Sequence, residues 1–326
     1  MTNSKLTDID MMMEQLTNQK NLQEKDTITE QINLLEIDLS RTSLSQLPDF
    51  QNNFQFCTTL NLSRNNLRGS IPWLANLKRL KWMDLSHNSL TGLSDVCGSI
   101  STLLYLNISH NNLTQLPDWI LYLDKVTELN LSYNSIPIAF QLHFKVAVWA
   151  KIQVCNLENT NLAIVPECLR SAPKLRELYV GNGASTSVVS MTMMSSTSNK
   201  LWRFSEPLPP SLCLLEVSNL MLANLETNWK SLIHLKELRA SANDISWFPY
   251  DLTSLSKLEV CDLNHNRLTI LPHDFGKLEN LCYINLAYNK VEVLPQSFGR
   301  LKNLKHLDLY SNRLESIECD FISMSR

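Results

Sequence analysis

The sequence is short of the features that mark enzymes and metal proteins. Its 326 residues contain no phosphate-binding G-x-x-x-x-G-K-[ST] loop, no H-E-x-x-H zinc-protease motif, no G-x-S-x-G nucleophile motif and no kinase H-R-D triplet. The eight cysteines are scattered, without a C-x-x-C pair of the kind that holds zinc or carries out redox chemistry. These absences predict a protein without catalytic residues, a cofactor or a bound metal.

Strong charge and long hydrophobic runs are also lacking. The net charge of -3 offers no basic footprint for nucleic acid. There is no run of about 18 apolar residues, which argues against a helix inserted in a membrane. The N-terminus has no basic start followed by an apolar stretch, so it does not resemble a secretory signal. Together with the unclustered cysteines, this predicts a reducing, cytoplasmic location.

What the sequence does contain is a repeat. Between residues 235 and 314, four units follow one another: LKELRASANDI, LEVCDLNHNRL, LCYINLAYNKV and LKHLDLYSNRL. Each fits L-x-x-L-x-L-x-x-N-x-L, and the same pattern recurs in a second array nearer the N-terminus. Within each array the asparagines are 23 residues apart. They are Asn65, Asn88, Asn111, Asn134, Asn243, Asn266, Asn289 and Asn312.

The physical logic of this pattern predicts a stacked architecture. Alternate side chains of a strand point to opposite faces, so each x-L-x-L core gives a short strand with its leucines inside. The asparagine stands at the strand exit, where its amide can satisfy backbone groups buried in the turn. One unit cannot bury its own leucine face, so neighbouring units must stack.

The segments between the strands complete the predicted fold. Their L-P-x-x-[FWI] sequence pattern, as at 116–123, indicates a turn followed by a short helical or 3-10 segment on the convex side. We therefore predict an α/β solenoid of about 12 repeats. It should be curved like a horseshoe, with a parallel sheet on its concave face.

The repeat also divides the chain into parts. Residues 34–314 form the predicted solenoid, residues 315–326 a short tail. Residues 1–33 carry apolar side chains at helical spacing, which predicts a helical cap over the open end of the leucine core. The order weakens over 156–222, where Thr160, Gly183 and Leu220 replace the asparagine. A Ser/Thr/Met-rich run at about 184–200 predicts a loop insertion there.

The outward-facing strand residues supply the candidate binding surface. Asp and Asn fill most of one row, as expected for a solvated polar ladder. Aromatic residues gather at two places beside acidic groups, as in protein-binding hot spots. The alternative is that each ring only packs on its neighbour in the ladder. The predicted partner-binding residues are Trp82, Asp84, Tyr105, Glu128, Tyr133, Asp262, Tyr283, Tyr288, His306, Asp308 and Tyr310.

Histidines and cysteines receive structural interpretations. His87 and His110 stand one repeat apart, just before the asparagine, but no third ligand accompanies them, so we expect no metal. Cys155 and Cys261 occupy leucine positions of the pattern. We expect both to be small buried hydrophobic side chains.

The motif, with L-P-x-x-F-x-x-L between units, resembles the typical 23-residue leucine-rich repeats of intracellular scaffold proteins. The stretch LTILPHDFGKLENLCYINLAYNKVEVLPQSFGRLKNLKHLDLYSNRL at 268–314 is similar to the Ras-group and Scribble/Erbin-type repeats. The resemblance covers 34–314 and is weakest over 156–222. It implies a curved solenoid that binds other proteins.

These observations favour a non-enzymatic scaffold or adaptor in signal transduction, binding a protein partner through the concave face. One alternative is the recognition part of a larger enzyme, such as a phosphatase, kinase or ubiquitin ligase, whose catalytic part lies outside this chain. A less favoured alternative is an extracellular pattern-recognition ectodomain, in which N-x-[ST] triplets such as that at Asn61 would be glycosylated. The pattern names neither the partner nor the oligomeric state.

Overall fold

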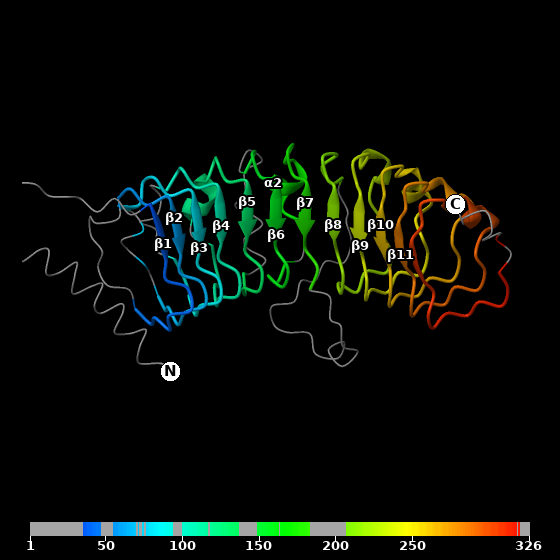
Figure 1. Cartoon of the computed structure of the whole chain (residues 1–326), viewed down its shortest axis with the longest axis horizontal. Helices are drawn as coiled ribbons and strands as arrows, with labels where there is room; N and C mark the ends of the chain where they lie inside the picture. Colours follow the sequence, from blue (N-terminus) through cyan, green and yellow to red (C-terminus); the bar gives the residue numbers. More distant parts are fainter. Residues whose placement is uncertain are drawn as a thin grey trace, which may run out of the picture.

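One twelve-stranded sheet dominates the computed structural model. Its strands follow one another in chain order from β1 to β12, and every neighbouring pair is parallel (Figure 1). The described residues are 35–46, 55–69, 71, 74, 76–93, 100–116, 118–136, 149–162, 164–182, 207–317 and 319. The predicted N-terminal cap at 1–33 and the predicted insertion at 184–200 lie outside them. The predicted solenoid with about 12 repeats is confirmed.

Each repeat contributes one strand of three residues. The strands are β1 (Glu36–Asp38), β2 (Thr59–Asn61), β3 (Trp82–Asp84), β4 (Tyr105–Asn107), β5 (Glu128–Asn130), β6 (Val154–Asn156), β7 (Glu177–Tyr179), β8 (Leu214–Glu216), β9 (Glu237–Arg239), β10 (Val260–Asp262), β11 (Tyr283–Asn285) and β12 (His306–Asp308). The middle residue of each strand points into the core. It is buried in every strand except β12, where it is half-buried. Cys155 and Cys261 are two of these buried residues.

The sheet continues through the irregular part of the chain. β7 pairs with β8 in the same register as every other pair, with Leu178 opposite Leu215, although 37 residues separate them. β6 pairs with β7 in the same way, with Cys155 opposite Leu178. The irregularity predicted over 156–222 therefore leaves the pairing of the strands unchanged.

The asparagines hold the turns that follow the strands. Nδ2 of Asn266 donates to the carbonyl oxygens of Ala240 in the preceding repeat and of Leu263 and Asn264 in its own, at 2.9, 3.0 and 3.2 Å. Its Oδ1 accepts the backbone N–H of Ile245 at 3.1 Å. The other seven asparagines of the two arrays make the same bonds to the preceding repeat. Each side chain thus joins two neighbouring repeats.

The opposite side of the solenoid carries little helix. Its described elements are η3 (Asp118–Tyr122), α2 (Glu167–Arg170), η6 (Trp229–Ser231), η7 (Tyr250–Ser254), η8 (Phe275–Lys277) and η9 (Gln296–Arg300). Proline precedes several of them directly, as Pro249 precedes η7 and Pro295 precedes η9. A proline tolerates this place because a helix start leaves its first N–H groups unbonded. The convex elements are mostly 3-10, so the α/β label describes a fold that is largely strand and turn.

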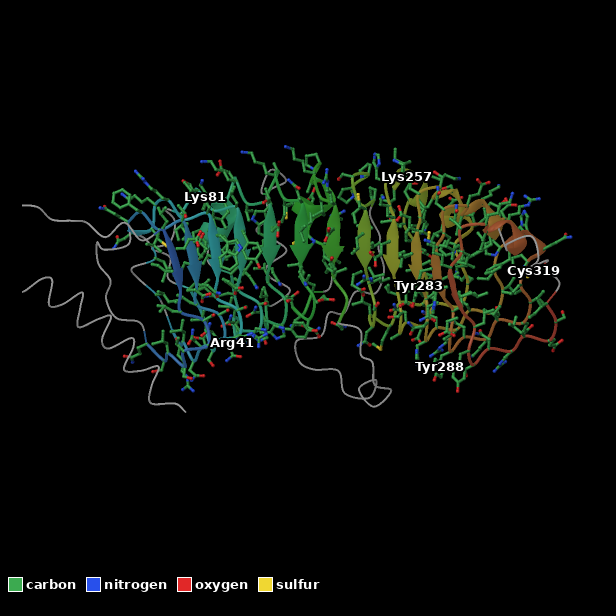
Figure 2. All side chains as sticks on the ribbon, viewed as in Figure 1. Arg41, Lys81, Lys257, Tyr283, Tyr288 and Cys319 are labelled. Carbon is green, nitrogen blue, oxygen red and sulfur yellow. The ribbon has the colours of Figure 1, made fainter. Side chains whose placement is uncertain are left out.

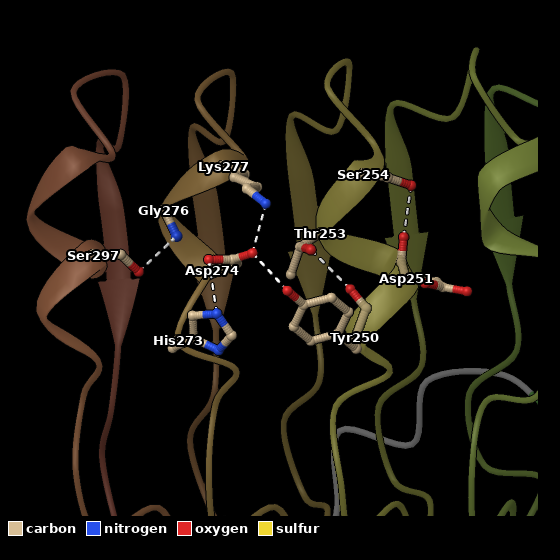
Figure 3. Close-up of polar contacts among 9 residues, drawn as sticks. All are labelled: Tyr250, Asp251, Thr253, Ser254, His273, Asp274, Gly276, Lys277 and Ser297. Carbon is tan, nitrogen blue, oxygen red and sulfur yellow. Dashed lines mark hydrogen bonds and ion pairs between the residues drawn. The ribbon is translucent and has the colours of Figure 1, made fainter.

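Aromatic side chains fill the space between the convex elements and the sheet. Phe248 meets Phe275 edge-on at 5.2 Å between ring centroids, and Phe275 stacks on Phe298 at 5.5 Å. On the surface of the same elements, the Tyr250 hydroxyl donates to Asp274 at 2.7 Å (Figure 3). Residues 274–276 spell the D-F-G triplet that also occurs in kinases. Here Phe275 is part of the buried stack, so the triplet has a packing role.

Beyond the last strand the chain continues the repeat for a few residues. Ser316 forms a parallel bridge with Val293, which in turn bridges Ile270. The described part of the predicted tail therefore lies alongside the preceding repeat. Among the residues that the structure describes, no helix has the length and apolar character needed to cross a membrane.

Candidate protein-interaction surface

The first and third residues of every strand point away from the leucine core and together form the concave face. Their rows run across the sheet, because each strand is in register with the next. Most of these side chains are half-buried or exposed, whereas the residue between them is buried. In Figure 2, Tyr283 marks this sheet, Tyr288 and Arg41 mark the edge where the strands end, and Lys81 and Lys257 mark the opposite edge.

The first aromatic site joins β3 and β4. The rings of Trp82 and Tyr105 stack at 4.9 Å between centroids, with an angle of 7° between their planes. Asp84 lies on the same strand as Trp82, and the exposed Glu128 stands next to Tyr105 on β5. Burial raises the pKa of Tyr105, and the charge of Asp84 adds to this rise. The structure thus brings these four predicted residues together as one aromatic and acidic site.

The second aromatic site lies near the other end, on β11 and β12. Tyr283 stacks on His306 at 4.5 Å, with an angle of 5° between the ring planes. Asp308 follows on β12, and Asp262 lies on β10. Stacking on a neighbour therefore occurs at both sites, and it leaves part of each tyrosine ring open to a partner.

Several acidic residues of the concave face also have a local structural role. Oδ1 of Asp84 accepts the backbone N–H of Ser86 at 2.8 Å, and Oδ1 of Asp308 accepts that of Tyr310 at 2.9 Å. Asp262 makes the equivalent bond to Asn264 at 3.1 Å. These bonds close the turn at the strand exit, which explains the Asp and Asn preference of this row. The three aspartates consequently combine a turn function with surface exposure.

The remaining predicted tyrosines lie beyond the strand exits, Tyr133 and Tyr288 in one row and Tyr310 one position earlier in its repeat. Tyr133 stacks on His110 at 4.2 Å, and His110 stacks on His87 at 4.1 Å. Tyr288 stacks on His265 at 4.1 Å. All five of these stacked residues have a positive φ between 52° and 56°, a left-handed backbone that directs each ring along the edge of the sheet. Tyr310 meets Tyr288 edge-on at 5.3 Å and is the most exposed of the three tyrosines, at 67%.

The row of histidines contains no metal site among the described residues. His87 and His110 face each other as stacked rings, and no third His, Cys, Asp or Glu ligand joins them there. Burial lowers the pKa of both histidines, and the charge of Arg64 lowers both further. Both rings are therefore neutral at pH 7.

A polar cluster at the centre of the sheet was missed by the sequence prediction. Glu216 on β8 is 4% exposed, and its carboxylate accepts the backbone N–H of Ser218 at 2.7 Å. The carboxylate lies close to Gly181, because a Cβ built on that glycine would be 3.0 Å from Oε1 of Glu216. Glu158, at the exit of β6, and Arg239, on β9, interact with it electrostatically. The signal was available in the sequence, since Glu216 and Arg239 depart from the Asp or Asn of their row.

Burial changes the protonation of this cluster. Loss of solvent raises the pKa of Glu216 to about 7, and the nearby charge of Glu158 adds to the effect. Burial also raises the pKa of Glu158 and of Asp262, while Arg239 opposes the shift at all three carboxyls. Arg239 itself is ion-paired with Glu237 on the same strand. The centre of the concave face therefore holds more carboxyl groups than its one guanidinium can compensate.

Comparison with known families agrees with this geometry. A leucine-rich repeat family model matches residues 78–136 and 256–314, and a second leucine-rich repeat model matches residues 56–77. The chain is a leucine-rich repeat protein. A search of curated proteins gives no match. The narrower resemblance to Ras-group and Scribble/Erbin-type repeats stays a prediction.

Several solved structures have the same fold as this protein. A leucine-rich repeat protein of Leptospira interrogans is 24% identical, with a TM-score of 0.67 over 88% of this chain and 75% of that one. YopM, a leucine-rich effector protein from Yersinia pestis, is 24% identical, with a TM-score of 0.65 over 88% and 68% of the two chains. The functional domain of InlJ from Listeria monocytogenes is 18% identical, with a TM-score of 0.69 over 91% and 57%. At these identities the similarity concerns the fold.

The described cysteines of this leucine-rich repeat protein are all free thiols. Burial raises the pKa of Cys155 and Cys261, so both remain protonated and behave as apolar core residues. Burial also raises the pKa of Cys57, to about 11, and that of Cys168, to about 12. These thiols lack the reactivity of a catalytic nucleophile.

Proposed function

We propose that this leucine-rich repeat protein is a non-enzymatic scaffold or adaptor that binds a protein partner through its concave face. The observation that supports this most directly is the pair of stacked aromatic sites, Trp82 with Tyr105 and Tyr283 with His306. Aromatic side chains provide large contact areas at low entropic cost, and they dominate the energy of many protein interfaces. A signalling role in the cytoplasm belongs to the same proposal.

The distribution of chemical groups supports binding over catalysis. Catalysis needs convergent groups held in an enclosed site. Here the polar residues repeat along a sheet, one set per strand, so that the same chemistry recurs over a long surface. Such a surface suits contact with an extended partner, with the strand-exit tyrosines Tyr133, Tyr288 and Tyr310 along its border.

The proposal is tested by capture of native partners with purified protein carrying single substitutions. Trp82→Ala and Tyr283→Ala should each reduce the recovery of specific partners about ten-fold or more, as expected for hot-spot residues. Tyr122→Ala is the matched control, because Tyr122 is 73% exposed on the convex element η3. This control should keep the recovery of the unmodified protein.

Thermal unfolding of the same variants separates loss of contact from loss of fold. Tyr283 lies on the surface of the sheet and packs on one neighbouring ring, so Tyr283→Ala should cost less than about 1 kcal/mol of stability. Equal recovery by all three variants would place the binding surface elsewhere. Loss of recovery only in parallel with unfolding would contradict the assignment of Tyr283 to the surface.

A further inference from the structure

The concave face has a charge that the whole chain does not share. The net charge of the chain is only -3. Yet the outward-facing residues of the twelve described strands include eight half-buried or exposed carboxylates, besides the buried Glu216, and, of Lys and Arg, Arg239 alone. The eight are Glu36, Asp38, Asp84, Glu128, Glu177, Glu237, Asp262 and Asp308. Compensating basic residues therefore lie off the sheet, as Arg41, Lys81 and Lys257 do along its edges (Figure 2).

The one Lys or Arg of the described strands, Arg239 on β9, does not compensate all the carboxylates around it. The guanidinium of Arg239 is ion-paired with Glu237. Within the described part of the chain, Glu128, Glu177 and Asp262 have no ion pair with Lys or Arg, although Glu177 accepts the hydroxyl of Tyr179 at 2.9 Å. Clustered carboxylates repel one another, and a cation from a partner would relieve that repulsion.

We propose that the concave face binds an extended, Lys- or Arg-rich segment of a protein partner along the carboxylates between β5 and β10, which lie in the two outward-facing rows of the sheet. This inference rests on the proposed function and specifies the class of partner. Trp82 with Tyr105 on one side, and Tyr283 with His306 on the other, flank this region and give aromatic contacts for the ends of such a partner.

The dimensions of the sheet set the length of the bound segment. Glu128 on β5 and Asp262 on β10 are five strand intervals apart, which is roughly 24 Å at about 4.8 Å per interval. An extended peptide advances about 3.3 Å per residue, so about seven or eight residues span this distance. Alternate side chains of such a peptide point to the same side. Four basic residues at alternate positions would therefore all face the sheet.

The test uses a fluorescent eight-residue peptide, (Lys-Ser)4, and its neutral counterpart (Gln-Ser)4, in anisotropy titrations at 0.15 M salt. The double variant Glu128→Gln/Glu177→Gln should bind (Lys-Ser)4 about ten-fold more weakly than the unmodified protein. The control double variant Asp124→Asn/Glu279→Gln removes the same charge from exposed positions off the strands and should remain within about two-fold. Glutamine and asparagine keep the size of the side chains that they replace, so both variant proteins should fold.

Each outcome decides the proposal. Equal weakening by the two double variants would show that binding depends on net charge alone, and would overturn the proposal. Binding of (Gln-Ser)4 as tight as that of (Lys-Ser)4 would overturn it as well. If Trp82→Ala loses native partners while Glu128→Gln/Glu177→Gln keeps them, the proposed function stands and the basic partner is rejected. If neither variant loses them, the concave face is not the binding surface and both proposals fall.

Discussion

The C-terminal array and the middle of the solenoid form the same sheet by different means. From β9 to β12, each repeat has an asparagine such as Asn266, whose side chain bonds to two neighbouring repeats. Around β6, Thr160 takes this place, and its hydroxyl donates to the Leu157 carbonyl of its own repeat at 2.7 Å. After β8 the place is taken by Leu220, an apolar side chain that is buried. Both regions nevertheless pair their strands in one register.

The difference distinguishes the alignment of the strands from the stabilisation of the turns, which occur together in every regular repeat. The strands align without an asparagine at the usual position of the turn, as the pairing of β7 with β8 shows. Other side chains join these two repeats, because the Asn182 amide donates to the Asn219 carbonyl and the Ser211 hydroxyl to the Leu175 carbonyl. The asparagine adds stability to the turns. Where the asparagine is absent, the surface also departs from the common pattern, and Glu216 is buried against Gly181. We therefore expect a weaker ladder in the middle of the solenoid, beside a more unusual surface.

The largest effect is expected for Asn266→Ala, which leaves one repeat of the regular array without a polar group at this position. Four hydrogen bonds are lost, and each is worth about 0.5–1.5 kcal/mol. The backbone N–H of Ile245 loses its partner, whereas each of the three carbonyl oxygens keeps a second hydrogen bond. We expect a loss of about 3 to 4 kcal/mol in the free energy of unfolding, measured by urea denaturation.

Asn280→Ala is the control for this substitution. The amide of Asn280 also bonds to a neighbouring repeat, at the Ser256 carbonyl, but at an exposed position where water can replace it. Its loss should be below about 0.5 kcal/mol. A similar small loss for both variants would show that the asparagines of the array do not stabilise the fold.

Glu216→Gln tests the middle region through pH. An unperturbed glutamate has a pKa of about 4.3, whereas that of Glu216 is raised to about 7 by burial. Between these values the folded protein binds more protons than the unfolded chain, so the contribution of Glu216 to stability falls as the pH rises. Above pH 7 the full penalty applies. Glutamine avoids it, so the variant should be more stable by about 2 to 3 kcal/mol at pH 8.

The same substitution should have almost no effect at pH 4, where Glu216 is protonated in the folded protein. Unfolding midpoints between pH 4 and pH 8 measure this trend. Glu128→Gln, the same substitution at an exposed position of the same sheet, serves as the control. A Glu216→Gln profile parallel to that of the unmodified protein would contradict the burial of this carboxyl.

Much of this architecture could be predicted from the sequence because the repeat encodes it locally. The spacing of Leu238, Asn243 and their equivalents defines strand, turn and register, and neighbouring copies support one another. The burial of Glu216 could not be predicted in this way, because it depends on the absence of a side chain at Gly181, 35 residues earlier. The stacking of Tyr133 on His110 also depends on a left-handed backbone that the pattern does not state.

Gly276→Ala tests how closely the repeats pack on the convex side of the regular array. A Cβ at this position would lie 2.0 Å from the carbonyl oxygen of Ser297 in the next repeat, where backbone meets backbone (Figure 3). The repeats must move apart locally to admit it, which should cost about 2 kcal/mol. Gly92→Ala is the control, since no atom lies within 4 Å of the Cβ there. Thermal unfolding should show a lower midpoint for the first variant and an unchanged or higher one for the second.

The smallest effect is expected for Thr160→Val, which removes the hydroxyl from the irregular region while keeping the shape of the side chain. The Thr160 hydroxyl donates to the Leu157 carbonyl of the same repeat, and valine cannot replace that bond. We expect a cost of about 1 kcal/mol in urea denaturation, well below that of Asn266→Ala. If Thr160→Val proved as damaging as Asn266→Ala, a single hydroxyl would stabilise the middle as well as the full asparagine network does elsewhere. The distinction between a strong and a weak ladder would then be wrong.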